Sequence, residues 1–365
     1  MTTQPPGLCV RRITVPGTLT GSDAADFLAF AAMRNAIYAE IAGNHDEDAS
    51  PDELLANYGA DADDERLAWL LELDGRVVGR ANAILPREEG SRSAYLEVNV
   101  LREVWGQGLG TAALAVLEDA AQARGRSVLQ IWAEHPEAAG QRLTPPTSVG
   151  SIPADHAARF LQAHGYTLEQ VELKSGVDLT RGHAEREALL PPTLATASGY
   201  RVVSWVGRTP TAFVEGYAGL KATMSTDAPV GDLEIDEQAW DADRVTRADD
   251  RHEAAGTTLL VTCAQHEGTG ELVAFTELFL GPDPSAATIQ GDTLVARQHR
   301  GHRLGTLVKL AALQQWRALA PASPRVLTWN AAENQAMLAI NHALGFQTLA
   351  SIGAWKKTAP SRPLR

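Results

Sequence analysis

The sequence predicts an α/β (α+β) protein made of two similar domains, and three observations indicate this. The chain has 365 residues, more than one typical domain core requires. A pattern of strand, glycine-rich loop and helix occurs twice, with Gly110 and Gly305 at matching places 195 residues apart. A helix that ends on a glycine also occurs twice, before Gly165 and before Gly345.

The repeated unit begins with an apolar run of partial alternation, which predicts a strand. In the first copy this run ends at Val100, and a glycine loop follows from Trp105 to Thr111. Apolar residues then recur at helical spacing up to Ala120, and residues 127–133 predict a further strand. The second copy repeats this order, with Val295, a loop from Arg300 to Thr306, a helix and a strand over 325–330.

The remaining segments complete two domains. Residues 68–85 and 257–280 each predict a strand pair. Residues 136–153, rich in Pro, Gly and small polar residues, predict a loop that is longer than its counterpart in the second copy. The Pro191-Pro192 pair lies in a stretch typical of a linker. We therefore expect domains at 1–182 and 199–365, joined by a linker at 183–198.

Composition excludes several classes of protein. The formal net charge is −13, which argues against nucleic acid as the main ligand. No stretch approaches the ~20 apolar residues of a membrane span, and the N-terminus lacks the pattern of a signal peptide. The two cysteines, Cys9 and Cys263, lie in apolar runs and are expected to be buried free thiols. A cytoplasmic enzyme or binding protein is the expectation.

Each glycine loop precedes a helix, and this context favours an anion site. A helix N-terminus leaves backbone N–H groups unpaired and carries positive potential, while glycines allow a ligand to approach closely. A pyrophosphate fits such a site. The loops contain neither the Gly-Lys-Ser/Thr of a P-loop nor the Gly-x-Gly-x-x-Gly of a dinucleotide fold. A tight turn without a ligand is the alternative for either copy alone.

The strand, the loop Gln/Arg-x-x-Gly-x-Gly/Ala and the later helix ending in Gly-Phe/Tyr resemble the acetyl-coenzyme A signature of GNAT N-acetyltransferases. The doubling resembles tandem GNAT proteins of actinobacterial type. The resemblance implies two GNAT-like domains, each a mixed, mainly antiparallel sheet flanked by helices. It also implies transfer of an acetyl or short acyl group from acetyl-CoA to a primary amine of a small molecule or peptide.

The resemblance also implies which residues hold the coenzyme. The strand valines would bind the pantetheine arm through backbone groups, the loops would bind the pyrophosphate, and the later asparagines would contact the coenzyme. In the second domain these positions are Val295, Arg300, Gly301, His302, Arg303, Leu304, Gly305, Thr306, Asn330 and Asn334. In the first domain they are Val100, Trp105, Gly106, Gln107, Gly108, Leu109, Gly110 and Thr111.

The two copies depart from the family pattern differently. Trp105 stands where Gln or Arg is usual, and Arg303 replaces a motif glycine, a place where we expect helical backbone. The tyrosine that many members use as a general acid is replaced by Leu161 and by Asn341. Because basic residues, Lys309 among them, surround the second loop, we expect the C-terminal domain to be the principal catalyst.

Acyl transfer needs a base for the amine, and carboxylates are the candidates. Glu97 and Asp292 each precede the strand valine by three residues, and Glu277 lies on the preceding strand. A structural hydrogen bond is the alternative for each. Asp227 and the acids at 232–237 could recognise a cationic amine, although an exposed acidic loop is the simpler interpretation. We expect no metal, because His299 and His302 have no companion ligands at suitable spacing.

Two other classes of function stay open at this point. A non-catalytic coenzyme A-binding or scaffold protein would account for the missing tyrosine in both halves. A purely structural pair of domains would bind no coenzyme at all. The sequence predicts a monomer or a homodimer and does not identify the amine.

Overall fold

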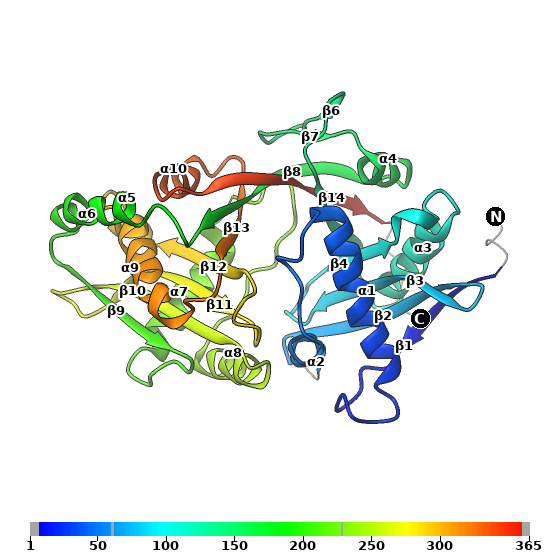
Figure 1. Cartoon of the computed structure of the whole chain (residues 1–365), viewed down its shortest axis with the longest axis horizontal. Coiled ribbons are helices and arrows are strands. Elements are labelled where there is room, and N and C mark those ends of the chain that lie inside the picture. Colours follow the sequence, from blue (N-terminus) through cyan, green and yellow to red (C-terminus); the bar gives the residue numbers. More distant parts are fainter. Residues whose placement is uncertain (1–6, 60–61, 228, 360–365) are drawn as a thin grey trace. The chain divides into compact units, whose positions relative to one another are not determined.

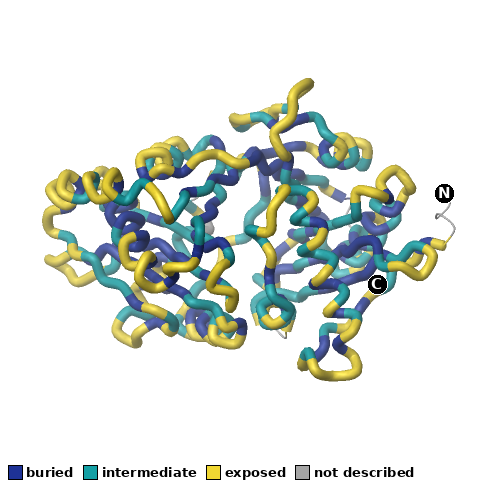
Figure 2. The backbone as a smooth tube through the Cα atoms, viewed as in Figure 1, coloured by how far each residue is buried: buried dark blue, intermediate teal, exposed yellow. Residues whose placement is uncertain are grey.

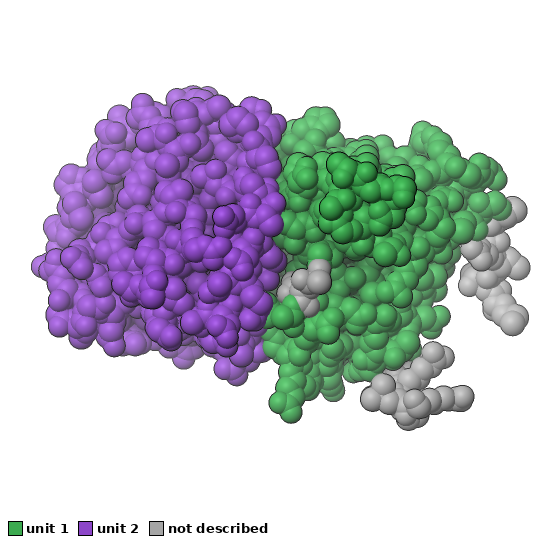
Figure 3. Space-filling view, turned by 90° about the horizontal axis from the view of Figure 1, so that it is seen from below, with its two compact units in different colours: residues 1–172, 230–236, 350–365 green, residues 173–229, 237–349 purple. Residues whose placement is uncertain are grey.

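The computed structural model describes residues 7–59, 62–227 and 229–359, and divides into two compact units (Figure 3). Unit 1 comprises residues 1–172, 230–236 and 350–365, and unit 2 comprises residues 173–229 and 237–349. The expected domains 1–182 and 199–365, with a linker at 183–198, stay a prediction. Each unit is described below by itself.

Unit 1 contains mixed strands in the order β1-β2-β3-β4-β5-β14, in which β14 spans Gln347–Thr358 (Figure 1). Strands β1 to β4 pair antiparallel, β4 and β5 pair parallel, and β14 pairs antiparallel with β5. Its elements are β1 (Leu8–Ile13), α1 (Ala25–Ala42), α2 (Pro51–Tyr58), β2 (Asp64–Leu73), β3 (Arg76–Pro86), β4 (Ser93–Val100), η1 (Arg102–Val104), α3 (Leu109–Gln122), β5 (Val128–His135), β6 (Arg142–Leu143), β7 (Ile152–Pro153), α4 (His156–Ala163) and the first half of β8 (Thr167–Asp178).

The strands of unit 2 follow the order β8-β13-β12-β11-β10-β9 with mixed pairing. Strands β9 to β12 pair antiparallel, and β12 and β13 pair parallel. Its further elements are α5 (His183–Ala188), α6 (Leu190–Thr196), β9 (Tyr200–Val206), α7 (Val214–Asp227), α8 (Ala242–Ala254), β10 (Thr258–His266), β11 (Leu272–Leu280), β12 (Thr288–Val295), η2 (Arg297–His299), α9 (Leu304–Leu319), β13 (Arg325–Ala331), α10 (Gln335–Ala343) and the start of β14 (Gln347–Thr358).

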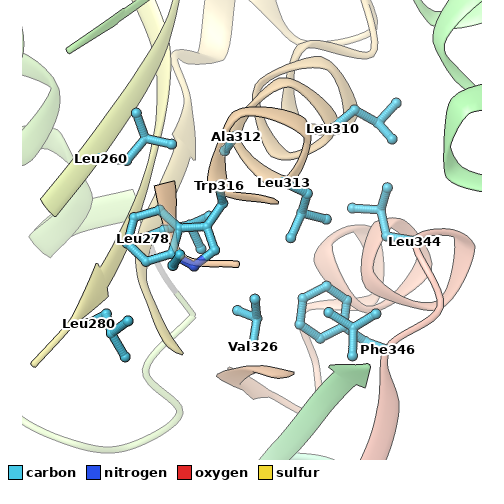
Figure 4. Close-up of a cluster of buried hydrophobic side chains, with 12 residues drawn as sticks. Leu260, Leu278, Leu280, Leu310, Ala312, Leu313, Trp316, Val326, Leu344 and Phe346 are labelled. Atoms are coloured by element: carbon cyan, nitrogen blue, oxygen red, sulfur yellow. The ribbon is translucent and has the colours of Figure 1, made fainter. Parts of the chain in front are cut away.

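Strand alternation divides the core of unit 2 between the two faces of its sheet. Along β10, Val261 packs with α7 and α8, whereas its neighbour Leu260 packs with α9. Figure 4 shows the second of these clusters, in which Trp316 of α9 meets Leu260 and Leu278. The sheet strands are buried while the helices expose their outer sides (Figure 2). The packing of α9 against this face of the sheet fixes the start of the helix, and with it the position of the loop that precedes it.

The core of unit 1 follows the same logic. Phe27 and Phe30 of α1 are fully buried and pack with Leu70 of β2. Helix α3 packs against β3 and β4. These contacts hold the first glycine loop, between β4 and α3, at the end of a buried strand. Both units therefore show the predicted fold class, a mixed sheet flanked by helices.

Some details differ from the expectations. The predicted loop at 136–153 contains the small antiparallel pair β6 and β7. The predicted linker region contains the short helices α5 and α6. Cys9 is exposed rather than buried, because it faces outward on the edge strand β1, while Cys263 is buried on β10. Burial raises the pKa of the Cys263 thiol, which fits an inert core residue.

Residues 351–358 of β14 pair with β5, from Ser351 opposite His135 to Thr358 opposite Val128. The last described strand of the chain thus completes the sheet that holds the first glycine loop. Among the helices described, none has the length and hydropathy that a membrane crossing requires.

Candidate coenzyme and acyl-transfer site

The two glycine loops adopt the same backbone conformation. In unit 1 the left-handed residues are Gly106 (φ 77°) and Gly108 (φ 82°). In unit 2 they are Gly301 (φ 89°) and Arg303 (φ 55°). The expectation of helical backbone at Arg303 is therefore wrong, because Arg303 is the N-cap of α9 and copies the turn made by Gly108. A side chain in the left-handed region costs about 1 kcal/mol or more, so Arg303 is held there by its surroundings.

The helices that follow both loops begin without a side-chain cap. Neither Gly108 before α3 nor Arg303 before α9 supplies a capping hydrogen bond. The first N–H groups of a helix have no acceptor within the helix, so they are open to a ligand. The next residues, Leu109 and Leu304, are buried and anchor each helix in its core. An exposed loop over a fixed helix start is a geometry that suits a pyrophosphate.

The glycines inside the helices serve packing. An added Cβ at Gly110 would lie 3.2 Å from the ring of Phe160, and one at Gly305 would lie 3.0 Å from Ile340 Cδ1. Both glycines thus allow the helix after the loop to approach the next helix, α4 or α10. The neighbouring Thr111 hydroxyl lies 3.0 Å from His164 Nε2, whereas the Thr306 hydroxyl has no hydrogen-bond partner among the described residues.

The second loop is cationic. Arg300 and Arg303 lie within it, Arg297 precedes it, and all three are exposed. Asp227, at the end of α7, accepts hydrogen bonds from Arg297 Nε at 2.5 Å and from Arg300 Nη2 at 2.9 Å. The Asp227 side chain is 3% exposed and holds the two loop arginines. It is therefore not free to recognise an amine, which is the role that the sequence suggested for it. A multiply charged anion would still find more positive than negative charge here.

The first loop is less suited to an anion. It contains no cation, and Glu40 accepts a hydrogen bond from the Arg102 backbone nitrogen beside it. Trp105 stacks on His156 with ring centroids 4.3 Å apart and an interplanar angle of 7°. Glu103 pairs with Arg76 nearby. Arg102 precedes the first loop as Arg297 precedes the second, but the first loop itself carries an aromatic side chain where the second carries Arg300.

In both units the two parallel strands stop pairing before they reach the glycine loop, which leaves an opening between them. Pairing of β4 with β5 ends at Tyr95 opposite Gln130, and pairing of β12 with β13 ends at Ile289 opposite Leu327. The strands continue to Val100 and Val295 without this partner. In both openings a loop side chain donates to the valine carbonyl, Trp105 Nε1 to Val100 at 2.8 Å and Arg300 Nε to Val295 at 3.2 Å. A ligand arm that used these carbonyls would have to displace the side chains.

Asp292 and Glu277 form one acid cluster with a lysine in unit 2. Lys221 Nζ of α7 donates to Asp292 Oδ2 at 2.7 Å and to Glu277 Oε1 at 3.1 Å. The Asp292 backbone N–H donates to Glu277 Oε2 at 3.0 Å, where a bulge shifts the register between β11 and β12. Tyr217 also donates to Glu277. Glu277 is thus fully engaged, whereas the Asp292 side chain is 39% exposed.

Lys221 is held as a cation. Burial alone would lower its pKa, but the charges of Glu277 and Asp292 outweigh burial and the pKa is raised. Its ammonium also lies over the rings of Trp240, at 4.9 Å, and Phe275, at 5.7 Å. Two carboxylates and two aromatic faces therefore surround one primary ammonium group.

Glu97, the counterpart of Asp292 in unit 1, is locked in an ion pair. Arg80 Nη2 donates to Glu97 Oε2 and the Tyr38 hydroxyl donates to Oε1, both at 2.6 Å. Burial raises the pKa of Glu97, but the Arg80 charge and these hydrogen bonds lower it by more. No register shift occurs between β3 and β4 here, where Asn82 lies opposite Glu97. These contacts favour the structural role for Glu97 over that of a base.

The asparagines of unit 2 serve different ends. The Asn334 side chain caps α10 by accepting from the Met337 backbone N–H at 3.2 Å. Asn330 lies near the end of β13 and accepts from Asn341 Nδ2 at 2.6 Å. Lys309, counted in the sequence with the basic residues around the second loop, is instead buried on α9. A coenzyme contact from either Asn330 or Asn334 stays a prediction.

The acids at 232–237 do not share one site. Glu234 and Asp236 belong to unit 1, where they accept hydrogen bonds from Arg92 and Ser91. Glu237 belongs to unit 2 and is exposed. Within the described ranges, no group of three or more His, Cys, Asp or Glu residues is arranged to hold a metal ion.

Several residues of these sites were missed from the sequence. The acids are contacted by residues from other elements of the fold, namely Lys221, Tyr217 and Arg80. No local sequence pattern predicts these contacts. The one usable signal was composition, since a lysine inside an otherwise apolar or small-residue helix segment, as in Gly-Leu-Lys-Ala, indicates a buried partner.

Comparisons with known proteins agree with this geometry. Residues 32–143 match the acetyltransferase (GNAT) family. A tandem GNAT protein from the clavulanic acid biosynthesis pathway superposes with a TM-score of 0.74 at 24% identity, covering 97% of this chain and 100% of that protein. No curated protein sequence matches this chain.

Other solved structures share the fold. A GCN5-related N-acetyltransferase from Sphaerobacter thermophilus gives a TM-score of 0.62 at 16% identity, covering 99% of this chain and 98% of its own. A glucosamine N-acetyltransferase region of a fungal multi-domain GH3 β-N-acetylglucosaminidase gives 0.59 at 13% identity, covering 96% of this chain and 38% of that protein. At these identities the likeness establishes the fold, and the family match supports acyl transfer in general.

Proposed function

We propose a function from this premise: the chain has the tandem GNAT fold, and its residues 32–143 belong to the acetyltransferase (GNAT) family. The proposed reaction is transfer of an acetyl or short acyl group from acetyl-CoA to a primary amine of a small molecule or peptide. The C-terminal domain, whose loop and strands lie in unit 2, is the proposed catalyst.

The observation that carries this choice of domain is the contrast between the two loops. Both have the same backbone turn, but only the second combines it with Arg300 and Arg303. Coenzyme A carries several negative charges on its phosphates, so the second loop favours it electrostatically. The family match covers residues 32–143, which include the first loop, and that loop keeps Gly108 where the second has Arg303. Keeping a sequence motif does not require keeping the activity.

The residues of unit 2 fit the coenzyme in two ways. The uncapped start of α9 and the loop from Arg300 to Thr306 would hold the pyrophosphate. The Val295 backbone, at the opening between β12 and β13, would hold the pantetheine arm after Arg300 moves to the phosphates. When bound, the coenzyme supplies the activated acyl group as a thioester.

Asp292 is the proposed base. The amine must lose a proton to attack the acyl carbon, and Asp292 is the more exposed carboxylate of the acid cluster. Glu277 accepts hydrogen bonds from three groups, so its proposed role becomes the placement of Asp292 and Lys221. Asp292 and Glu277 also make this region attractive to a cationic amine.

The test uses two equivalent loop variants, His302→Glu and Gln107→Glu. Both positions are exposed, neither has a left-handed backbone, and each variant adds one negative charge. Calorimetric titration with acetyl-CoA should show binding that His302→Glu weakens by about tenfold or more and Gln107→Glu leaves within about twofold. The reverse pattern would move the site to the first domain. Failure of the wild type to bind would sink the transferase proposal.

The alternative is a non-catalytic coenzyme A-binding or scaffold protein. The absence of the general-acid tyrosine, replaced by Leu161 and Asn341, is the observation that keeps it in view. Release of free thiol from acetyl-CoA with a panel of primary amines separates the two. Binding with no amine-dependent thiol release favours the alternative.

A further inference from the structure

Lys309 is a buried lysine without an acidic partner. It lies on α9, five residues after the start of the helix, and is 1% exposed. Its ammonium contacts the Asn341 side chain and lies 5.0 Å from the Phe346 ring centre. Among the described residues no carboxylate pairs with it. Burying an ammonium group with only neutral partners is costly, so its retention calls for an explanation.

A chain of hydrogen bonds leads from Lys309 to the opening in the sheet. Lys309 Nζ donates to Asn341 Oδ1 at 2.5 Å, and Asn341 Nδ2 donates to Asn330 Oδ1 at 2.6 Å. Asn341 is 2% exposed. Asn330 lies in the part of β13 beyond its last pairing with β12. The hydrogen-bond chain therefore connects the inside of the unit with the opening between β12 and β13, the place proposed for the pantetheine arm.

The lysine charge fixes the direction of this chain. A protonated lysine can only donate, so the oxygen of the Asn341 amide must face it. The Asn341 nitrogen must then face Asn330, and the Asn330 oxygen must face Asn341. The Asn330 nitrogen is left as the donor at the far end, and it has no partner among the described residues. A neutral lysine could accept a hydrogen bond, and this order would no longer be imposed.

Unit 1 has none of the three residues of this hydrogen-bond chain. Lys309 follows Gly305 by four residues, and the residue four after Gly110 is Leu114. Asn341 precedes Gly345 by four, and the residue four before Gly165 is Leu161; both leucines are buried. Asn330 follows Val326 of β13 by four, and Trp132 follows Val128 of β5 by four. The fold is thus built equally well with an apolar pair, and unit 2 alone carries the costly polar one.

We propose, as a deepening of the proposed function, that Lys309 and Asn341 are positioning residues. They hold Asn330 so that its amide N–H groups stabilise the negative charge that develops on the thioester sulfur as the acyl group leaves it. In the transfer, the amine nitrogen bonds to the acyl carbon and the carbon–sulfur bond breaks, its electron pair staying on sulfur. The amine proton passes to Asp292, and the thiolate takes a proton from solvent. Asn330 donates hydrogen bonds throughout and loses no proton.

In this arrangement the Asn330 amide takes the place of the missing general-acid tyrosine as a hydrogen-bond donor, and the Lys309 charge strengthens it. A neutral amide is a weak donor by itself, but a cation two links away polarises the chain. Because Lys309 is buried, solvent screens its charge little. The same burial lowers its pKa to about 7, so this charge acts at and below neutral pH and is lost above it.

The test is the ionisation of the thiol of bound coenzyme A. The double variant Lys309→Leu/Asn341→Leu reproduces the leucine pair of unit 1 and should therefore fold. Asn330→Ala removes only the terminal donor, and Gln314→Leu, an exposed change on the same helix, is the control. Ultraviolet absorbance follows thiolate formation against pH, with desulfo-coenzyme A as the reference that cancels protein absorbance.

Because burial lowers the pKa of Lys309 to about 7, the comparison is made at about pH 6–7, where the lysine keeps charge. There the wild type and Gln314→Leu should hold an about tenfold larger fraction of the bound thiol as thiolate than free coenzyme A does at the same pH. The double variant and Asn330→Ala should return it to the free value. With an amine identified by thiol release, the double variant should lower kcat about tenfold and leave the KM for acetyl-CoA within about twofold. A merely structural role for Lys309 would leave the ionisation of the thiol unchanged.

These measurements distinguish failure of this inference from failure of the proposed function. Binding of coenzyme A with the same thiol ionisation in the wild type and in Asn330→Ala would overturn this inference and leave the proposed function standing. A wild type that does not bind coenzyme A would overturn both. If the double variant does not fold, Asn330→Ala decides the matter.

Discussion

Arg80 Nη2 donates to Glu97 Oε2 over 2.6 Å inside unit 1, and Arg80 itself is only 2% exposed. The guanidinium also donates to Asn99 and lies over the Phe30 ring. Unit 1 thus neutralises its acid with a cation from the neighbouring strand, whereas unit 2 neutralises Asp292 with Lys221 from a helix. The Glu97 side chain is 24% exposed and the Asp292 side chain is 39% exposed, so the second arrangement leaves more of its carboxylate open to solvent.

Removing one partner of the buried pair should destabilise unit 1. We expect Arg80→Met to lower the free energy of unfolding by about 3–5 kcal/mol, because Glu97 is left without its cation. The double variant Arg80→Met/Glu97→Gln should recover part of that loss. Urea denaturation measures both. Equal stability of Arg80→Met and the wild type would contradict the ion-pair assignment, and unchanged acetyl-CoA affinity in the double variant would agree with a site in unit 2.

Arg303 permits a test that separates strain from charge. Arg303→Gly should relieve the left-handed backbone and raise stability by up to about 1 kcal/mol, while it weakens acetyl-CoA binding by loss of a cation. Gly108→Arg, the reciprocal change in unit 1, should lower stability by about 1 kcal/mol. Thermal unfolding and calorimetry report the two effects. A loss of stability in Arg303→Gly would show that the arginine makes a contact that outweighs its backbone cost.

The surroundings of Lys221 should accept an external amine once its own ammonium is removed. We expect Lys221→Ala to be destabilised by several kcal/mol, since Glu277 and Asp292 lose their shared cation. Millimolar propylammonium should raise the melting temperature of this variant and leave that of the wild type unchanged. Propanol, which matches propylammonium in size but is uncharged, is the control ligand. Equal effects of the two compounds would exclude recognition of the charge.

The stability contributed by Lys309 should depend on pH in a defined direction. Burial lowers its pKa to about 7, below the value of 10.5 for an ordinary lysine. Between these values the unfolded chain binds more protons than the folded one, so wild-type stability rises with pH in this window and the full cost applies below it.

The double variant Lys309→Leu/Asn341→Leu lacks this titration. Its stability advantage over the wild type should be largest near pH 6 and shrink by about 1.4 kcal/mol for each pH unit within the window. Urea denaturation of both proteins across the pH range measures the difference. An advantage that stays constant with pH would mean that Lys309 does not titrate there.

The sequence was informative where the structure is local. Glycine spacing around Gly106 and Gly301 predicted two loops between strand and helix, and the strand pairs and following helices are confirmed. These features depend on periodicity and turn chemistry over a few residues, which a single sequence records. The fold class followed from the repetition of this unit.

The remainder depends on contacts between distant residues. Nothing near Asp292 in the sequence indicates Lys221, because their ion pair joins a helix to a strand through the fold. The left-handed turn at Arg303 is set by its place before α9 and overrides the preference of arginine. The burial of Lys309 likewise follows from how α9 packs against α10. Local propensity does not determine any of these.

The pairing of residues 351–358 with β5 has a consequence for the order of synthesis. The strand that borders β5 leaves the ribosome long after β1 to β5, so the sheet of unit 1 keeps an unpaired edge while the rest of the chain is made. Such a long-range pairing is slow to form and exposes that edge to other chains in the meantime. Translation that stops before Ser351 would therefore yield a first half with an open, aggregation-prone sheet edge, whether or not the second half had folded.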